Sequence, residues 1–238
     1  MQDFVAYINS QLSQGQYSCQ CVANIDETNV NFHMECGLTL ANKGYKTLSL
    51  KTTGTSMRCS VQLGVTLNGE KLTTLVVFKG QPNGRIARTF NWMLASMKYV
   101  CQEKALVDQR IFKHWIAEVW RPFTVERADK TYLLVDEFSD HLMTKCCNIF
   151  KECGLEVGYI LGHYTSKLQV MDVGVNKPFK GYVREAYENF MIGNPENRKV
   201  RREEIVQWIQ TGREKVKVKT ITRTWNRIGI NLQDVANV

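Results

Sequence analysis

The chain has 238 residues, of which 44% are hydrophobic and 23% are charged. These proportions are typical of a globular protein, and the length suits one large domain or one domain with an appendage. No apolar run approaches the roughly 18 residues of a membrane helix, and the N-terminus lacks the apolar core of a signal peptide. We therefore expect neither membrane association nor secretion.

The basic charge is concentrated toward the C-terminal end. The formal net charge is +8, and residues 177–227 hold 13 Lys or Arg and 6 Glu, an excess of +7. Such an end favours a polyanion partner, nucleic acid first. A solvated helix face that only aids solubility is the alternative. We expect a boundary near residue 193, which separates a main domain (20–192) from a basic helical extension (193–238). A lead-in helix (1–19) precedes the main domain.

The eight cysteines are expected to be reduced thiols, because the chain shows no sign of secretion. Cys19 and Cys21, together with Cys36 and Cys59, offer a zinc site as the alternative. No second closely spaced pair at zinc-ribbon spacing supports that alternative, which makes thiols the better interpretation.

The first half of the chain predicts a helix followed by antiparallel strands. Residues 1–18 place Phe4, Ile8 and Leu12 on one helical face. Residues 21–30 then form a short strand, and residues 36–58 are loop-like. The clearest local signal is Asn68-Gly69, which favours a tight hairpin turn between strands at 59–67 and 71–80.

The second half alternates helices and buried strands, which predicts an α/β fold with helices packed on a mixed sheet. The apolar run TYLLV is typical of a central parallel strand. Pro122 is expected to end one helix, and Pro178 favours a start near Asn176 for another. The expected elements are a helix at 108–123, a strand at 131–135, a helix at 140–153, a strand at 155–161 and a helix from Asn176 onward.

Three aspartates lie at the ends of apolar segments, at Asp26, Asp136 and Asp172. If the strands that end on the first two lie side by side, both carboxylates reach the same edge of the sheet. A cluster of carboxylates is electrostatically unfavourable unless a divalent cation neutralises it. Taken singly, each Asp is more often a helix cap or a turn residue, so only the joint pattern predicts a metal site.

Four sequence segments, which include the three aspartates, together resemble a known family. The segments NIDETNV, RCSVQLGVTLNGEKLTTLVVFKG, TYLLVDEFSDH and HYTSKLQVMDVGVNKPFK resemble the DDE superfamily endonuclease domain, in the pogo/Tigger branch of the mariner superfamily. The resemblance covers roughly residues 20–230, and the 35 residues between Asp136 and Asp172 are typical of its all-Asp triad. It implies an RNase H-like α/β fold with a mixed five-stranded sheet, the first three strands antiparallel and helices on both faces.

The resemblance also implies an activity. Asp26, Asp136 and Asp172 would be the catalytic residues and would bind two Mg²⁺ or Mn²⁺ ions to cleave or transfer DNA strands. A nuclear location and DNA as partner follow, and a homodimer is compatible with it. The alternative is a catalytically inactive, co-opted DNA-binding or scaffolding protein of the same fold. Two departures keep that alternative open: the charged Glu137, and Gly162-His163 where the family has a proline-rich loop.

Secondary candidates surround these aspartates. His141 could shuttle protons, although a histidine that opens a helix is more often a capping or packing residue. A group of cations could contact the phosphate backbone, with a solvated face or strand-edge protection as the alternative. These cations are Lys79, Lys177, Lys180 and Arg184.

The front of the chain differs from the family. Family transposases carry an N-terminal helix-turn-helix region that reads the transposon ends, whereas only 25 residues precede Asp26. We therefore expect an isolated catalytic domain, in which recognition of the ends is absent or supplied by another protein.

Overall fold

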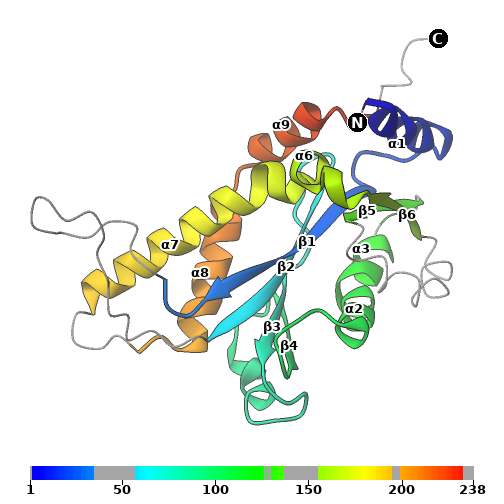
Figure 1. Cartoon of the computed structure of the whole chain (residues 1–238). Helices are drawn as coiled ribbons and strands as arrows, with labels where there is room; N and C mark the ends of the chain where they lie inside the picture. Colours follow the sequence, from blue (N-terminus) through cyan, green and yellow to red (C-terminus); the bar gives the residue numbers. More distant parts are fainter. Residues whose placement is uncertain are drawn as a thin grey trace, which may run out of the picture.

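The computed structural model describes residues 2–34, 57–125, 127, 130–136, 155–194 and 199–232. Within these residues, strands form one mixed sheet with helices on both faces (Figure 1). The strands are β1 (Val22–Asn31), β2 (Arg58–Thr66), β3 (Leu75–Lys79), β4 (Lys98–Gln102), β5 (Thr131–Asp136) and β6 (Leu155–Ile160). The helices and helical turns are α1 (Gln2–Gln14), η1 (Ala87–Trp92), α2 (Gln109–Trp115), η2 (Ile116–Trp120), α3 (Arg121–Val125), η4 (Gly162–Tyr164), α6 (Thr165–Leu168), η5 (Met171–Val175), α7 (Asn176–Gly193), α8 (Arg202–Lys215) and α9 (Val218–Ile228).

The strand order is β4-β3-β2-β1-β5-β6. β2 is antiparallel to both of its neighbours, β1 and β3. On the other side of β1, β5 is parallel to β1 and β6 is parallel to β5. This arrangement confirms the expected α/β mixed sheet and its antiparallel start. The expected five strands are one too few, because β4 pairs in parallel with the outer side of β3. Only Cys101 of β4 is buried, so β4 has no alternation of buried and exposed side chains that would predict a strand from the sequence.

The turn between β2 and β3 confirms the Asn-Gly hairpin. Gly69 has φ of +91°, a conformation that residues with a Cβ rarely adopt. Its backbone nitrogen donates to the Thr66 carbonyl at 3.0 Å. A Cβ at Gly69 would also lie 2.6 Å from the Val218 side chain on α9, so close helix packing adds a second reason for glycine.

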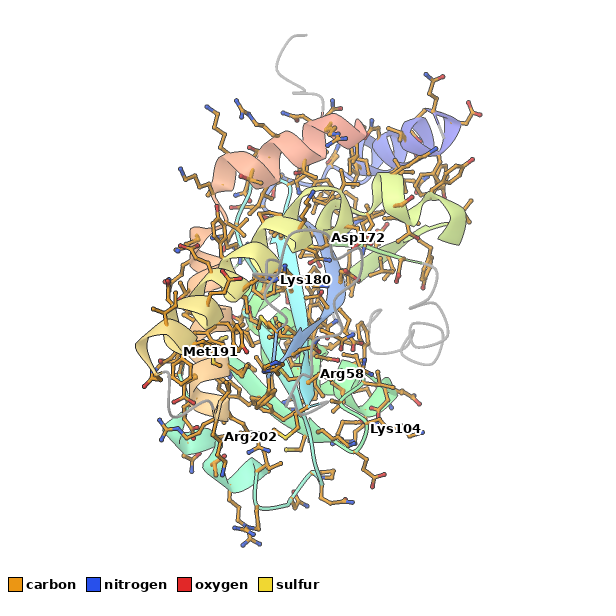
Figure 2. All side chains as sticks on the ribbon, turned by 60° about the vertical axis from the view of Figure 1, so that its left-hand side comes forward. Arg58, Lys104, Asp172, Lys180, Met191 and Arg202 are labelled. Atoms are coloured by element: carbon orange, nitrogen blue, oxygen red, sulfur yellow. The ribbon has the colours of Figure 1, made fainter. Side chains whose placement is uncertain are left out.

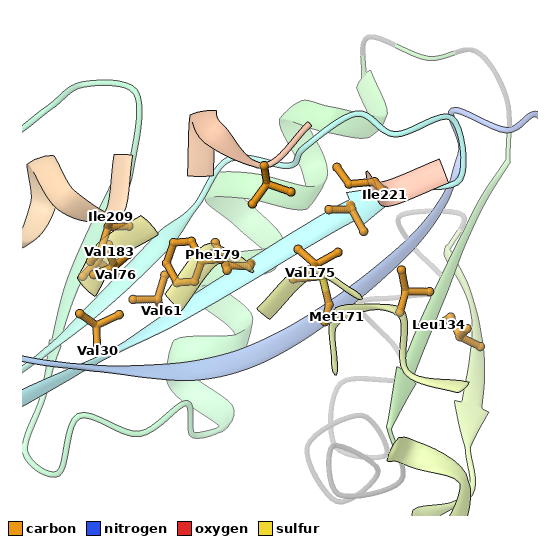
Figure 3. Packing of buried hydrophobic residues seen from close by; sticks show 14 of the residues in the cluster. Val30, Val61, Val76, Leu134, Met171, Val175, Phe179, Val183, Ile209 and Ile221 are labelled. Atoms are coloured by element: carbon orange, nitrogen blue, oxygen red, sulfur yellow. The ribbon is translucent and has the colours of Figure 1, made fainter. Parts of the chain in front are cut away.

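Each face of the sheet has its own hydrophobic cluster. One cluster contains Cys59, Val61, Leu63 and Val65, alternate residues of β2, packed under η5, α7, α8 and α9 (Figure 3). The other cluster lies under α2, η2 and α3 and includes alternate residues of β1 and β5. Period-two alternation along the strands therefore divides the apolar side chains between the two helical layers.

Helices near both ends of the chain contribute side chains to the first of these clusters. Ile8 and Leu12 come from α1, Trp208 comes from α8 and Trp225 from α9, and all four are buried. The indole nitrogen of Trp225 donates to the Thr66 carbonyl of β2 at 2.9 Å. The boundaries at 19/20 and 192/193 remain predictions, while the helices on either side of them share one packed interior.

Proline does not end the helix after Asp108. The Asp108 side chain accepts from the Ile111 backbone nitrogen at 2.9 Å and caps α2 at its N-terminus. The chain then passes through the π-helical turn η2 into α3 and stays helical to Val125, so the expected stop at Pro122 is wrong. Pro122 lacks the N–H that would donate to a carbonyl one turn earlier in the helix. The wider π-helical turn η2 lies directly before α3 and so precedes the residue that cannot make this bond.

Other expectations fall partly outside the described residues. The helix expected at 140–153 and Cys36 of the alternative zinc site both lie there. Four cysteines are described and none of them forms a disulfide, with Cys19 exposed and the others buried: Cys21, Cys59 and Cys101. In the described part of the chain, no helix is both long and apolar enough to span a membrane.

Candidate active site

Asp26 and Asp136 come from neighbouring parallel strands. The register of β1 and β5 pairs Asn24 with Leu134, and two further residues along each strand bring Asp26 beside Asp136. Both side chains are of intermediate exposure. Asp136 is the last residue of β5, as predicted. The prediction that Asp26 ends its strand is wrong, because β1 continues to Asn31 in pairing with β2. Asp26 therefore reaches the end of β5 from the middle of β1.

Asp172 reaches the same place from η5. This π-helical turn leads without interruption into α7, which begins at Asn176 as expected. The turn lies tight against α9, because a Cβ at Gly174 would stand 2.0 Å from the Thr224 hydroxyl oxygen. Pro178 lies in the first turn of α7, where its missing N–H leaves no helical hydrogen bond broken. The wider turn η5 comes before α7, as η2 comes before α3 and Pro122.

Asn176 joins two of the three aspartates. Its Nδ2 donates to Asp26 Oδ2 at 2.6 Å and to Asp172 Oδ1 at 3.1 Å. Asn176 is buried, and its own Oδ1 has no hydrogen-bond partner among the described residues. The first and third aspartates are thus connected through one amide, although 145 residues lie between them in the sequence.

The carboxylates disturb one another electrostatically. Burial raises the pKa of Asp26 to about 7, and repulsion from Asp172 and then from Asp136 adds to the effect, while the hydrogen bond from Asn176 opposes it. Mutual repulsion of this kind marks acidic groups that share a site. No group of three or more His, Cys, Asp or Glu side chains in the described residues is already drawn together as a metal-binding set. The aspartates are within electrostatic reach of one another, with an amide between two of them.

The expected DNA-contacting cations occupy two regions. Lys177, Lys180 and Arg184 are exposed on α7, which runs alongside β1. Its start contacts Asp26 through Asn176. Nearer its end, Tyr187 Oη lies 3.0 Å from Nδ1 of His33, just beyond β1. In Figure 2, Asp172, Lys180 and Met191 follow one another along this helical segment.

Lys79 lies farther away. It is exposed at the end of β3, two strands from β1. The residue before it, Phe78, is level with Val30 through the shared partner Cys59. Strand spacing puts it roughly 20 Å from Asp26. The two secondary candidates, Glu137 and His141, lie outside the described residues.

Asn176 is the site residue that sequence reasoning missed. It was expected only as a helix start, yet it stands four residues after Asp172, a spacing that places two side chains on one helical face. That spacing was a usable signal. Its contact with Asp26 had no local signal, because it depends on how α7 lies across β1.

Comparisons with known proteins identify the family of this chain. The family model of the DDE superfamily endonuclease matches residues 54–225, a stretch that contains Asp136 and Asp172 but not Asp26. The human protein "Pogo transposable element with KRAB domain" is 27% identical over 180 residues, which is 74% of this chain and 28% of that protein. The human "Pogo transposable element with ZNF domain" is 23% identical over 186 residues, or 78% of this chain and 13% of that protein.

Solved structures share the fold at low sequence identity. The Mos1 mariner paired-end complex with Mn has a TM-score of 0.61 at 10% identity and covers 95% of this chain and 57% of that one. The Mos1 strand transfer complex has a TM-score of 0.60 at 10% identity and covers 95% and 56%. This chain therefore has the RNase H-like fold of a transposase catalytic domain, and it spans about a quarter or less of the curated relatives it matches. Because the family model covers well over half of its residues, the chain belongs to the DDE superfamily endonuclease family.

Proposed function

We propose that this chain cleaves or transfers DNA strands with two divalent metal ions, Mg²⁺ or Mn²⁺, held by Asp26, Asp136 and Asp172. One observation carries the proposal: carboxylates from three distant segments converge where β1 and β5 run side by side, and Asn176 bonds two of them. A Mos1 mariner paired-end complex with Mn shares the fold, which supports the choice of ion.

The residues fit hard divalent cations. Mg²⁺ and Mn²⁺ prefer oxygen ligands, and three carboxylates supply them. Burial and then repulsion from Asp172 and Asp136 raise the pKa of Asp26, and a bound cation would relieve that repulsion. Asn176 occupies one oxygen of Asp26 and one of Asp172, and each carboxylate has a second oxygen.

The protein's own contribution is to position these groups. When bound, the ions would activate a water or a 3′-hydroxyl and stabilise the leaving oxygen of the phosphodiester. Asn176 fixes the relative orientation of Asp26 and Asp172. Asp26, whose pKa is raised to about 7, must release its proton to become a ligand. Activity is therefore expected to increase as the pH rises through that range.

The DNA backbone would follow α7. Lys177, Lys180 and Arg184 are exposed on this helix, downstream of Asp172, and form no ion pair within the described residues. A path along α7 would lead the phosphates toward the carboxylates. Lys79 would contact the duplex at a more distant point. The proposal extends to a nuclear location and to a homodimer as the working assembly.

Nicking of supercoiled plasmid tests the activity. The wild-type chain is expected to nick plasmid in Mn²⁺ or Mg²⁺ and to stop when EDTA is added. The Asp136→Ala variant, purified in the same way, is expected to be inactive in both metals, and it controls for a contaminating nuclease. A wild-type chain that is inert in both metals would defeat the catalytic proposal.

Salt dependence tests the DNA path. Changing Lys177, Lys180 and Arg184 together to Gln is expected to reduce the slope of log K against log salt by up to about 3, roughly 0.9 per phosphate contact. Fluorescence anisotropy with a short duplex, from about 50 to 200 mM salt, measures this slope. A matched control removes three exposed cations elsewhere, at Lys113, Arg121 and Lys130. Equal slope losses in both triple variants would mean that only net charge matters.

A second function of another class is a DNA-binding or scaffolding protein without turnover. The observation that favours it is Asn176, whose amide donates to both Asp26 and Asp172 and so offsets part of their repulsion without any cation. This function predicts salt-dependent DNA binding that Asp26→Ala leaves unchanged, in a chain that nicks no DNA. Binding and nicking measured on the same preparation separate the two functions.

A further inference from the structure

Two fully buried amide side chains lie directly behind the three aspartates. Asn24 and Gln169 each have 0% of their surface exposed. Burying an amide is costly unless its donors and acceptors are satisfied. Asn24 is two residues before Asp26 and Gln169 is three residues before Asp172. Neither amide is used in the chemistry proposed above, so their burial requires another explanation.

The hydrogen bonds of this amide pair reach all three aspartate-bearing segments. Asn24 Nδ2 donates to the Leu134 carbonyl and to Gln169 Oε1, both at 2.9 Å. Leu134 precedes Asp136 by two residues. Asn24 Oδ1 accepts from the Met171 backbone nitrogen at 3.1 Å, immediately before Asp172. Gln169 Nε2 donates to the carbonyl of Ile25 at 2.9 Å, immediately before Asp26.

The hydrogen bonds of the Asn24 and Gln169 side chains begin where the backbone pairing between β1 and β5 ends. The register between β1 and β5 ends at Asn24 and Leu134, while β5 continues along β6 as far as Asp136. Beyond Asn24 the two strands are connected to each other and to η5 through the amide side chains. A packed and fully satisfied polar network has one preferred geometry. It can therefore fix the distance between carboxylates that the backbone ladder no longer sets.

We infer that Asn24 and Gln169 are positioning residues that set the spacing of Asp26, Asp136 and Asp172 for divalent metal binding. This inference rests on the proposed metal-dependent function. The pair touches neither metal nor DNA, and it acts through the backbone groups next to each aspartate. Groups that orient metal ligands typically change metal affinity or activity by about 10- to 100-fold when they are removed.

The test replaces Gln169 with Met, which has a similar length and volume but no amide. The variant loses the bond to the Ile25 carbonyl and leaves Asn24 one acceptor short. Ser60→Ala is the matched control, because Ser60 is also fully buried and donates to the Ala105 carbonyl at 2.6 Å and to Asn29 Oδ1 at 3.1 Å. These bonds lie on the opposite face of the sheet from Asp26, on a neighbouring strand.

Gln169→Met is expected to lower Mn²⁺ affinity, measured by calorimetry, and the kcat for nicking by about 10- to 100-fold each. Its KM for DNA is expected to stay within about twofold, because the exposed cations of α7 are unchanged. Ser60→Ala is expected to lower the melting temperature comparably while keeping Mn²⁺ affinity and kcat near wild type. If Gln169→Met does not fold, Gln169→Asn, whose amide is one methylene shorter, is measured in its place.

The outcomes separate this inference from the proposed function. A wild-type chain that binds Mn²⁺ but nicks no DNA ends the catalytic proposal, and Mn²⁺ affinity alone then decides the positioning role. Weakened binding in the Gln169 variant, with normal binding in Ser60→Ala, supports that role. Equal Mn²⁺ affinities in the wild type and both variants overturn it, as does equal loss in both variants. A wild-type chain that binds no Mn²⁺ also overturns it.

Discussion

Replacing Asp26 with Asn is expected to abolish nicking and, at the same time, to stabilise the metal-free protein near pH 8. The activity should fall by at least ~10³-fold, because an amide cannot supply the charge that holds a divalent cation. The stability should rise because Asp26 is mostly buried and is repelled by Asp172 and Asp136, which raises its pKa to about 7. An isosteric neutral side chain removes both penalties.

The sign of the stability effect follows from proton binding. The pKa of Asp26 is about 7 in the folded protein, against 3.8 for the unperturbed group. Between these values the folded state holds a proton that the unfolded state has lost, so stability falls as the pH rises through the window. The Asn variant lacks this fall. Near pH 8 it should therefore melt ~2–4 °C above wild type, corresponding to ~1 kcal/mol, and the gap should close toward pH 4.

Calorimetric melting of metal-free protein across this pH window measures the effect. Asp3→Asn on α1 is the matched control, because it removes one exposed carboxylate far along the sequence from the site. Its melting temperature should stay within about 1 °C of wild type. If Asp26→Asn is less stable than wild type near pH 8, the carboxylates do not repel each other as the structure indicates. If it nicks normally, Asp26 is not part of the active site.

Trp225→Ala is expected to destabilise the protein by about 4 kcal/mol. Trp225 has 0% of its surface exposed, and its indole nitrogen donates to the Thr66 carbonyl at 2.9 Å. The truncation leaves a cavity under α9 and removes one of two hydrogen bonds to the Thr66 carbonyl, which still accepts from the Gly69 nitrogen. For a chain of this size the melting temperature should fall by roughly 8–16 °C.

Two further variants separate the causes of this loss. Trp225→Phe keeps a ring in the core but loses the hydrogen bond, so it should cost only about 1–2 kcal/mol. Val218→Ala, at a side chain that is 55% exposed on the same helix, should stay within about 0.5 kcal/mol of wild type. Denaturant unfolding measures all three. A loss below about 1 kcal/mol for Trp225→Ala would show that α9 is not an integral part of the core.

The same truncation should also reach the active site. α9 packs on η5, where Gly174 approaches Thr224 too closely to allow a Cβ. η5 carries Asp172, so a loosened α9 removes the support behind one of the three carboxylates. Helices near the C-terminus therefore contribute to the site without lending it a side chain.

The sequence alone was sufficient for the elements with strong local patterns. The Asn68-Gly69 turn between two strand-like segments predicted the hairpin, because the need for positive φ at a tight turn is a local property. The apolar β5 predicted a central strand that ends on Asp136. Local rules failed at Pro122, because a π-helical turn before it lets the helix continue through the proline. They also failed at β4, because backbone pairing holds this edge strand and leaves no pattern in its side chains.

The identity and order of the three aspartates came from the sequence, and their mutual arrangement came from the tertiary structure. Spacing along the chain could not show that Asn176 bonds Asp26 or that Asn24 and Gln169 connect all three segments. Those contacts join residues more than 100 positions apart, and they form only when η5 and α7 settle on β1 and β5. Local propensity carries no information about such partners, because burial between packed layers is what selects them.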